Sequence, residues 1–223
     1  MVETTKRVQP FLLSCGVLAA LLYLGTDILA GLLWEGYSFA HQAVSELSAV
    51  DAPTRSLTFS LYLVYNVLLI AFGWGVWRSA GPKRALRITG GVLIGIGVVG
   101  FVGIPFPLHL GAPEAEFTNM MHTLIAGVVA ILFMLAIGFG AIALGKRFRF
   151  YSIGTLLLTI INGGVLGLMA GPRIAEEGFT MPPRWFGLSE RISIYGSMMW
   201  IMVLAIVLLR IEKKAGLVSN SSG

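Results

Sequence analysis

Seven residues of types that bind anions or transfer protons stand out in a chain with few ionisable groups. They are Asp27, His41, Ser45, Glu46, His122, Glu190 and Arg191. An arginine can hold an anionic group, and a histidine or a glutamate can transfer a proton when its surroundings adjust its pKa. If these side chains converge, the sequence predicts a site for a lipid-like or peptide-like ligand. Hydrolysis is one reaction that such a set of residues can carry out.

Asp27 lies inside the first long apolar stretch, 16 residues after Phe11. At a rise of about 1.5 Å per residue the carboxylate is roughly 24 Å along a helix, near the far boundary of a hydrocarbon core about 30 Å thick. A charge at this depth is unfavourable unless it has a partner, for which Arg173, Arg191 and His122 are the candidates. The alternative is a carboxylate that contacts water among the lipid headgroups.

Arg191 follows Ser189 and Glu190 at the start of the last apolar stretch. A serine there is a common helix cap, and a glutamate favours the positive N-terminal end of a helix. The arginine opposes the same helix dipole. We therefore expect it to have an anionic partner, which could be Asp27, Glu46 or a lipid phosphate.

The segment 37–49, after the first apolar stretch, has two interpretations. In a helix, His41 and Ser45 would share one face. The favoured interpretation is an amphipathic helix on the membrane surface, capped by Ser38. The alternative is a folded-back segment that directs Ser45 and Glu46 toward the mouth of the bundle. The histidine spacing contains neither His-x-x-x-His nor His-Glu-x-x-His, and we predict no metal and no cofactor.

The composition indicates which elements position these residues. Of the 223 residues, 56% are hydrophobic and only 12% are charged, and the mean hydropathy is +0.83. These values exclude a soluble globular enzyme and favour an integral membrane protein whose partners are membrane lipids. The net charge of +5 comes from basic residues that lie between apolar runs, so it indicates membrane topology and no nucleic-acid partner.

Six stretches are long and apolar enough to cross a bilayer. They are Phe11 to Leu33, Leu57 to Trp77, Ile88 to Pro105, Met120 to Leu144, Phe150 to Gly171 and Ile192 to Arg210. The predicted fold is an all-α bundle of six transmembrane helices that forms one domain over residues 1–214, followed by a disordered tail at 215–223. Small residues recur every four positions in the third and fifth stretches, which predicts that these two helices pack together at the centre.

Twelve of the 16 basic residues lie on the side of the membrane that carries both termini. The other four are Arg55, Arg173, Arg184 and Arg191. By the positive-inside rule, both termini are predicted to be cytoplasmic, in a multi-pass protein of the cell membrane.

Three short motifs resemble a known family. They are Ser45–Ala49 (SELSA), Met121–His122 and Gly187–Arg191 (GLSER). Together with the six-span layout they resemble the prokaryotic membrane family DUF998. The resemblance implies the fold and the membrane location. It implies no activity, because none is established for that family.

The sequence leaves three classes of function open, and it does not decide whether the protein is an enzyme. The first is the ligand site on the outer face. The second is a small solute or proton-coupled transporter whose path is lined by Asp27, Asn66 and Asn162. The third is a non-catalytic structural or regulatory subunit that binds a partner membrane protein or a second copy of the chain.

Overall fold

The computed structural model describes the backbone of residues 2–110, 116–177 and 185–221. Side chains are described for residues 8–110, 117–164, 185–215 and 217. The six long helices are α1 (Val2–Leu33), α2 (Arg55–Arg78), α3 (Arg84–Val102), α4 (Glu116–Ala143), α5 (Lys146–Glu177) and α6 (Phe186–Ser221). One short 3₁₀ helix, η1 (Val44–Ser48), lies between α1 and α2. Over the described backbone there is no strand, so the all-α prediction is confirmed.

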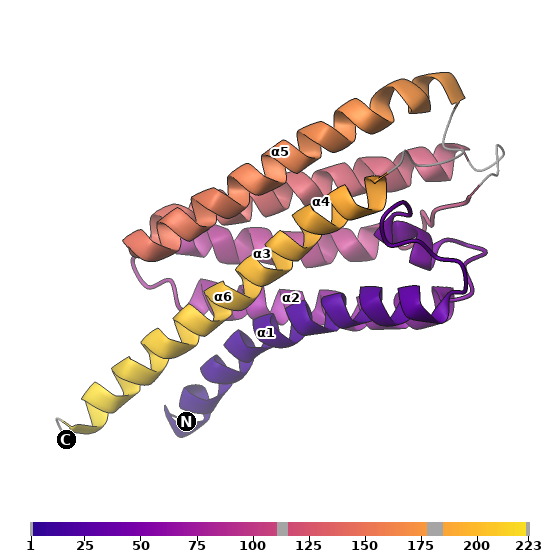
Figure 1. The fold of residues 1–223 in the computed structure, drawn as a ribbon. Coiled ribbons are helices and arrows are strands. Elements are labelled where there is room, and N and C mark those ends of the chain that lie inside the picture. The colour runs from indigo at the N-terminus through magenta and orange to yellow at the C-terminus, as the bar shows by residue number, and fades with distance from the viewer. Residues whose placement is uncertain (1, 111–115, 178–184, 222–223) are drawn as a thin grey trace.

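The helices pack in chain order. Each one contacts its neighbours in the sequence, and α6 returns to pack against α1, which closes the arrangement. Figure 1 shows the helices running roughly lengthwise in one bundle. The inward faces form one apolar core, in which Phe72, Leu93, Ile137 and Trp200 are almost completely buried.

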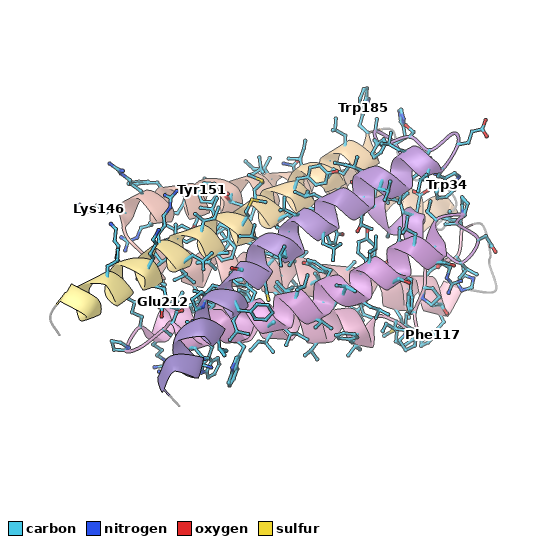
Figure 2. All side chains as sticks on the ribbon, turned by 90° about the horizontal axis from the view of Figure 1, so that it is seen from below. Trp34, Phe117, Lys146, Tyr151, Trp185 and Glu212 are labelled. Carbon is cyan, nitrogen blue, oxygen red and sulfur yellow. The ribbon has the colours of Figure 1, made fainter. Side chains whose placement is uncertain are left out.

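The bundle has two distinct ends. Both termini lie at one end, called here the terminal end, beside the short connections α2–α3 and α4–α5 (Figure 1). The other end, called here the loop end, carries the α1–α2 loop (residues 34–54) and the starts of α4 and α6. In Figure 2, Trp34, Phe117 and Trp185 mark the loop end, and Lys146 and Glu212 mark the terminal end.

Five of the six long helices are long and apolar enough to cross a membrane: α1, α2, α3, α4 and α6. Of the six predicted transmembrane stretches, five thus lie in helices that are long and apolar enough to cross a membrane, and α5 is not among them over the described residues. Large apolar side chains also cover the outside of the bundle, where Leu32 is 72% exposed and Phe150 is 73% exposed. A soluble protein rarely exposes so much contiguous apolar surface, whereas lipid chains solvate it.

Glycines let α2 and α3 approach closely. A methyl group added at Gly90 would lie 2.6 Å from the backbone nitrogen of Trp77, and one at Gly73 would lie 2.8 Å from the carbonyl oxygen of Gly90. Small residues at such a contact are the usual basis of helix packing in lipid. The predicted central pairing of the third and fifth helices was wrong. Over the described residues α3 packs on α2 and α4, and α5 packs on α4 and α6, because α4 lies between them.

The helix α6 continues to Ser221. It therefore extends into residues 215–221, for which the sequence predicts a disordered tail.

Candidate functional site

Asp27 and Arg191 form a buried ion pair at the loop end. Nε of Arg191 donates to Oδ2 of Asp27 and Nη2 donates to Oδ1, both at 2.9 Å. Asp27 is 0% exposed and Arg191 is 5% exposed. This two-point geometry is the strongest pairing available to a guanidinium and a carboxylate. The sequence-based expectation that each residue needs an oppositely charged partner is confirmed, and of the three candidates for Asp27 it is Arg191 that fills the role.

The remaining N–H groups of Arg191 bind the α1–α2 loop and the first turn of α6. Nη1 donates to the backbone carbonyls of Phe39, Gln42 and Gly187 at 2.8, 2.9 and 3.2 Å. Nη2 also donates to the hydroxyl of Tyr37 at 2.6 Å. The guanidinium carbon lies 5.0 Å from the centre of the Phe39 ring and 5.5 Å from that of Tyr37, which adds cation–π attraction. All five N–H donors of the guanidinium are thus engaged within the protein.

Two tyrosines complete the hydrogen bonding of the pair. The hydroxyl of Tyr195 donates to Oδ2 of Asp27 at 2.5 Å. The hydroxyl of Tyr37 donates to the backbone carbonyl of Ala43 at 2.8 Å while it accepts from Arg191. Burial raises the pKa of Tyr37, against a smaller opposing effect of Arg191, so this hydroxyl keeps the proton that it donates.

The α1–α2 loop folds back onto the bundle, and the prediction of an amphipathic surface helix was wrong. Residues 37–43 are irregular apart from a turn at 39–41 and a bend at 42, and the only helix in the loop is the five-residue η1. Val44, Glu46 and Leu47 of η1 are buried. The two apolar side chains are better accommodated against α1, α2 and α6 than on a headgroup surface, so the folded-back alternative describes the segment.

Glu46 and Glu190 fix this loop through its backbone. Oε1 of Glu46 accepts from the N–H of Ala43 at 2.9 Å, and Oε2 accepts from Nε2 of Gln42 at 3.0 Å. Oε2 of Glu190 accepts from the N–H of Val44 at 2.7 Å. A buried N–H without such an acceptor would cost about 1–3 kcal/mol. Glu190 therefore holds the loop on the start of α6, and Glu46 fixes the turn within the loop.

We call this set of residues the loop clamp. It comprises Asp27, Tyr37, Glu46, Glu190, Arg191 and Tyr195. Its hydrogen bonds run between α1, α6 and the α1–α2 loop. In the geometry described, the clamp binds protein groups, and a catalytic role for its members stays a prediction.

The other three candidate residues lie apart from the clamp hydrogen bonds. His41 is exposed, with its Nδ1 2.8 Å from the hydroxyl of Ser38 and its ring 5.7 Å from that of Trp185. Ser45 lies in η1, where its carbonyl accepts from the hydroxyl of Ser48. His122 lies near the start of α4, and its Nδ1 is 3.1 Å from the carbonyl oxygen of Phe106.

His122 instead lines a cavity of about 230 Å³ between the loop-end halves of α2, α3 and α4. The other polar side chains in its lining are Ser48, Arg55, Tyr62 and Asn66. None of the described residues that line this cavity is acidic. We call it the α2–α4 cavity.

Ser48, Arg55 and Tyr62 were not among the predicted site residues. For Arg55 and Tyr62 the spacing gives a signal. Intervals of four, three and four residues separate Arg55, Phe59, Tyr62 and Asn66. This spacing places them on one face of a helix. Whether that face meets a neighbouring helix or leaves a void depends on packing, which the spacing does not specify.

Tyr62 and Asn66 of α2 both belong to the cavity lining. The hydroxyl of Tyr62 is buried and, among the described residues, has no hydrogen-bond partner. Its ring packs on that of Tyr23 at a centroid distance of 5.1 Å, which fixes its orientation. Asn66 is 8% exposed and lies against Gly100, where a Cβ atom would overlap its amide.

A second hollow, of about 390 Å³, lies at the terminal end beside Trp77, Arg84 and Arg87. Both arginines are exposed, and the guanidinium of Arg87 donates to the carbonyl of Gly81. It is larger than the α2–α4 cavity, but none of the seven predicted site residues lines it, whereas His122 lines the α2–α4 cavity. We therefore take the α2–α4 cavity as the candidate site.

The residues expected to line a transport path lie in separate places. Asp27 belongs to the loop clamp and Asn66 to the α2–α4 cavity. Nδ2 of Asn162 donates to the carbonyl of Leu158 in its own helix, α5. Over the described residues, no three side chains among His, Cys, Asp and Glu gather closely enough to hold a metal ion.

Comparison with known proteins gives one result. No curated protein and no solved structure matches the chain. Residues 17–207 match the model of the family described as a protein of unknown function, DUF998, which confirms the resemblance carried by the SELSA and GLSER motifs. Since this match covers most of the 223 residues, the chain belongs to the DUF998 family of membrane proteins.

Proposed function

We propose that the protein binds a lipid-like, amphiphilic ligand in the α2–α4 cavity. The observation that carries this proposal is the make-up of the lining. Phe59 and Ile104 line the cavity and are 41% and 40% exposed on the outside of the bundle. Arg55, Asn66 and His122 line the same space. Apolar groups at a lipid-facing rim combined with polar groups inside suit a molecule with a hydrocarbon part and a polar head.

The volume limits which part of the ligand enters. At about 230 Å³ the cavity is below the range of about 300–1,000 Å³ that encloses drug-sized molecules. It accommodates a headgroup or the end of a chain, and the rest of an amphiphile would remain in the bilayer. The ligand would then enter sideways, from the membrane.

The loop clamp supports this site from behind. Glu46, which is held in the clamp, and Ser48, which lines the cavity, lie two residues apart in η1. The N–H of Val50 donates to the carbonyl of Leu108, another lining residue, at 2.9 Å. A clamp that fixes the α1–α2 loop thereby fixes one wall of the cavity, which is the preorganisation that favours binding.

Hydrolysis is a second candidate function, and the tautomer of His122 favours it. The carbonyl of Phe106 can only accept, so Nδ1 carries the hydrogen and Nε2 remains available to accept a proton. Ser48, whose hydroxyl donates to the carbonyl of Ser45, also lines this cavity, whereas Ser45 does not. His122→Gln should abolish turnover of a short-chain lipid ester if this chemistry operates. Turnover that survives the substitution would contradict hydrolysis by His122, and ligand binding would remain as the proposed function.

The membrane arrangement is also part of the proposal. We take α5 as the sixth span, both termini as cytoplasmic and the cell membrane as the location. The distribution of the 16 basic residues supports this orientation. The α2–α4 cavity would then lie at the outer leaflet.

A photoreactive phospholipid with its diazirine in the acyl chain would test the binding proposal in vesicles. We expect saturable labelling of α2 and α4 that unlabelled lipid competes away. Ala126→Trp should suppress this labelling, because Ala126 lines the cavity. Ala130→Trp is the matched control, since it lies one turn further along α4, is also exposed and is not part of the lining. Labelling that never saturates, or that both variants leave unchanged, would contradict the proposal.

A further inference from the structure

Arg55 gives the α2–α4 cavity a positive charge that the described protein groups do not neutralise. Its Nη1 donates to the backbone carbonyl of Val50 at 3.2 Å. Over the residues with described side chains, the single ion pair is that of Arg191 with Asp27. The guanidinium is half-buried and has four further N–H donors. A cation in this position is best stabilised by an anion that enters the cavity.

Asn66 adds an amide donor deeper along α2, and His122 on the opposite wall leaves Nε2 as an acceptor. Among the described lining residues there is one arginine, one histidine, an asparagine amide and two hydroxyls, and no carboxylate. A zwitterionic or cationic headgroup would need an acidic group for its positive part. The free N–H donors of one arginine, together with the amide of Asn66, instead match several anionic oxygens on a single centre.

We infer that the α2–α4 cavity is selective for an anionic, phosphate-bearing headgroup, with Arg55 as its counter-charge. This inference rests on the proposed function and adds the chemical class of the ligand. The same phosphate chemistry could come from a phospholipid or from a free phosphate compound.

Short-chain probes separate these sources. Affinities of the full-length protein in neutral detergent would be measured for dihexanoyl phosphatidic acid, dihexanoyl phosphatidylcholine, glycerol phosphate and inorganic phosphate. We expect phosphatidic acid to bind more tightly than phosphatidylcholine by about 10-fold or more, the range of a charge-assisted hydrogen bond. Equal affinities for the two lipids would overturn the inference.

Arg55→Gln should remove this preference for phosphatidic acid. Arg78→Gln is the matched control, because Arg78 lies in the last turn of the same helix, is exposed and is not part of the cavity lining. A preference that survives in Arg55→Gln, or that disappears equally in Arg78→Gln, would overturn the assignment of the charge. Elution profiles and melting temperatures would show that both variants are folded.

The outcomes also separate this inference from the proposal on which it rests. If the photoreactive lipid labels the cavity but the short-chain probes show no headgroup preference, the lipid-binding proposal stands and the inference of an anionic headgroup is wrong. Inorganic phosphate that binds as tightly as phosphatidic acid, and does so through Arg55, would retain the anion site and reject the lipid-like ligand.

Discussion

Asp27 and Arg191 are 164 positions apart in the chain, yet they form a buried ion pair. Two guanidinium nitrogens of Arg191 each lie 2.9 Å from one carboxylate oxygen of Asp27. The pair joins α1 to α6, the first and the last helix of the bundle. Since Arg191 also binds carbonyl groups of the α1–α2 loop, one side chain connects both ends of the sequence to the loop that walls the α2–α4 cavity.

Arg191→Gln should destabilise the protein strongly, because it leaves Asp27 buried without a counter-charge. Loss of one partner of a buried pair typically costs about 3–5 kcal/mol. Thermal or denaturant unfolding in detergent would measure the effect. The double variant with Asp27→Asn should lose less than the sum of the two single variants. Arg210→Gln, at an exposed position of α6, should unfold like the wild type, and a similar loss there would argue against the pair.

Glu46→Ala should release the α1–α2 loop while the bundle stays folded. The N–H of Ala43 and the amide of Gln42 would lose their acceptors. A local loss of about 1–3 kcal/mol corresponds to amide hydrogen exchange that is faster by about 5- to 150-fold. Exchange measured by mass spectrometry over residues 38–50 would detect it. Glu35→Ala, an exposed position of the same loop, is the control, and equal exchange in both variants would contradict the role of Glu46.

Gly90→Ala should separate α2 from α3. The added methyl would lie 2.6 Å from the backbone of Trp77 and 2.7 Å from that of Gly73, and overpacking of this kind costs about 1–3 kcal/mol. Gly95→Ala in the same helix meets nothing within 4 Å and should be neutral or stabilising by up to about 1 kcal/mol through helix propensity. Melting temperatures of the two variants should therefore move in different directions, and a parallel shift would refute the close contact.

Single-cysteine labelling can decide whether α5 crosses the membrane. Cys15 is 1% exposed and should stay silent to a membrane-impermeant maleimide. Cysteines placed at Leu110 and Trp185 should react in intact cells. Cysteines at Lys83 and Gly145 should react only after permeabilisation. If Trp185 and Gly145 label from the same side, α5 does not span the membrane.

The sequence predicted the general layout well because that layout follows from local properties. Apolar stretches of sufficient length specify helices that lipid can solvate, and five of the six are confirmed as apolar enough to cross. The position of Arg191 at the start of a helix was enough to predict an anionic partner. In both cases, the deciding free energy depends only on one segment of the chain and on the solvent around it.

The grouping of the site residues could not be predicted in the same way. Asp27, Glu46, Glu190 and Arg191 come together, but His122 lies instead in a cavity with Arg55 and Tyr62. The segment after α1, expected to be a surface helix, is a folded-back loop. Its buried Val44 and Leu47 are stabilised by packing on three helices, and a local sequence pattern does not predict such long-range contacts.

The amino-acid sequence by itself determined where this protein resides, which segments are helical and which residues need a partner, because solvation and helix formation depend on near neighbours in the chain. Only the tertiary structure decided which partner each residue has and where a cavity remains. Those outcomes depend on how closely the helices approach one another. Gly73 and Gly90 let α2 approach α3, and the pair of Arg191 with Asp27 joins α6 to α1.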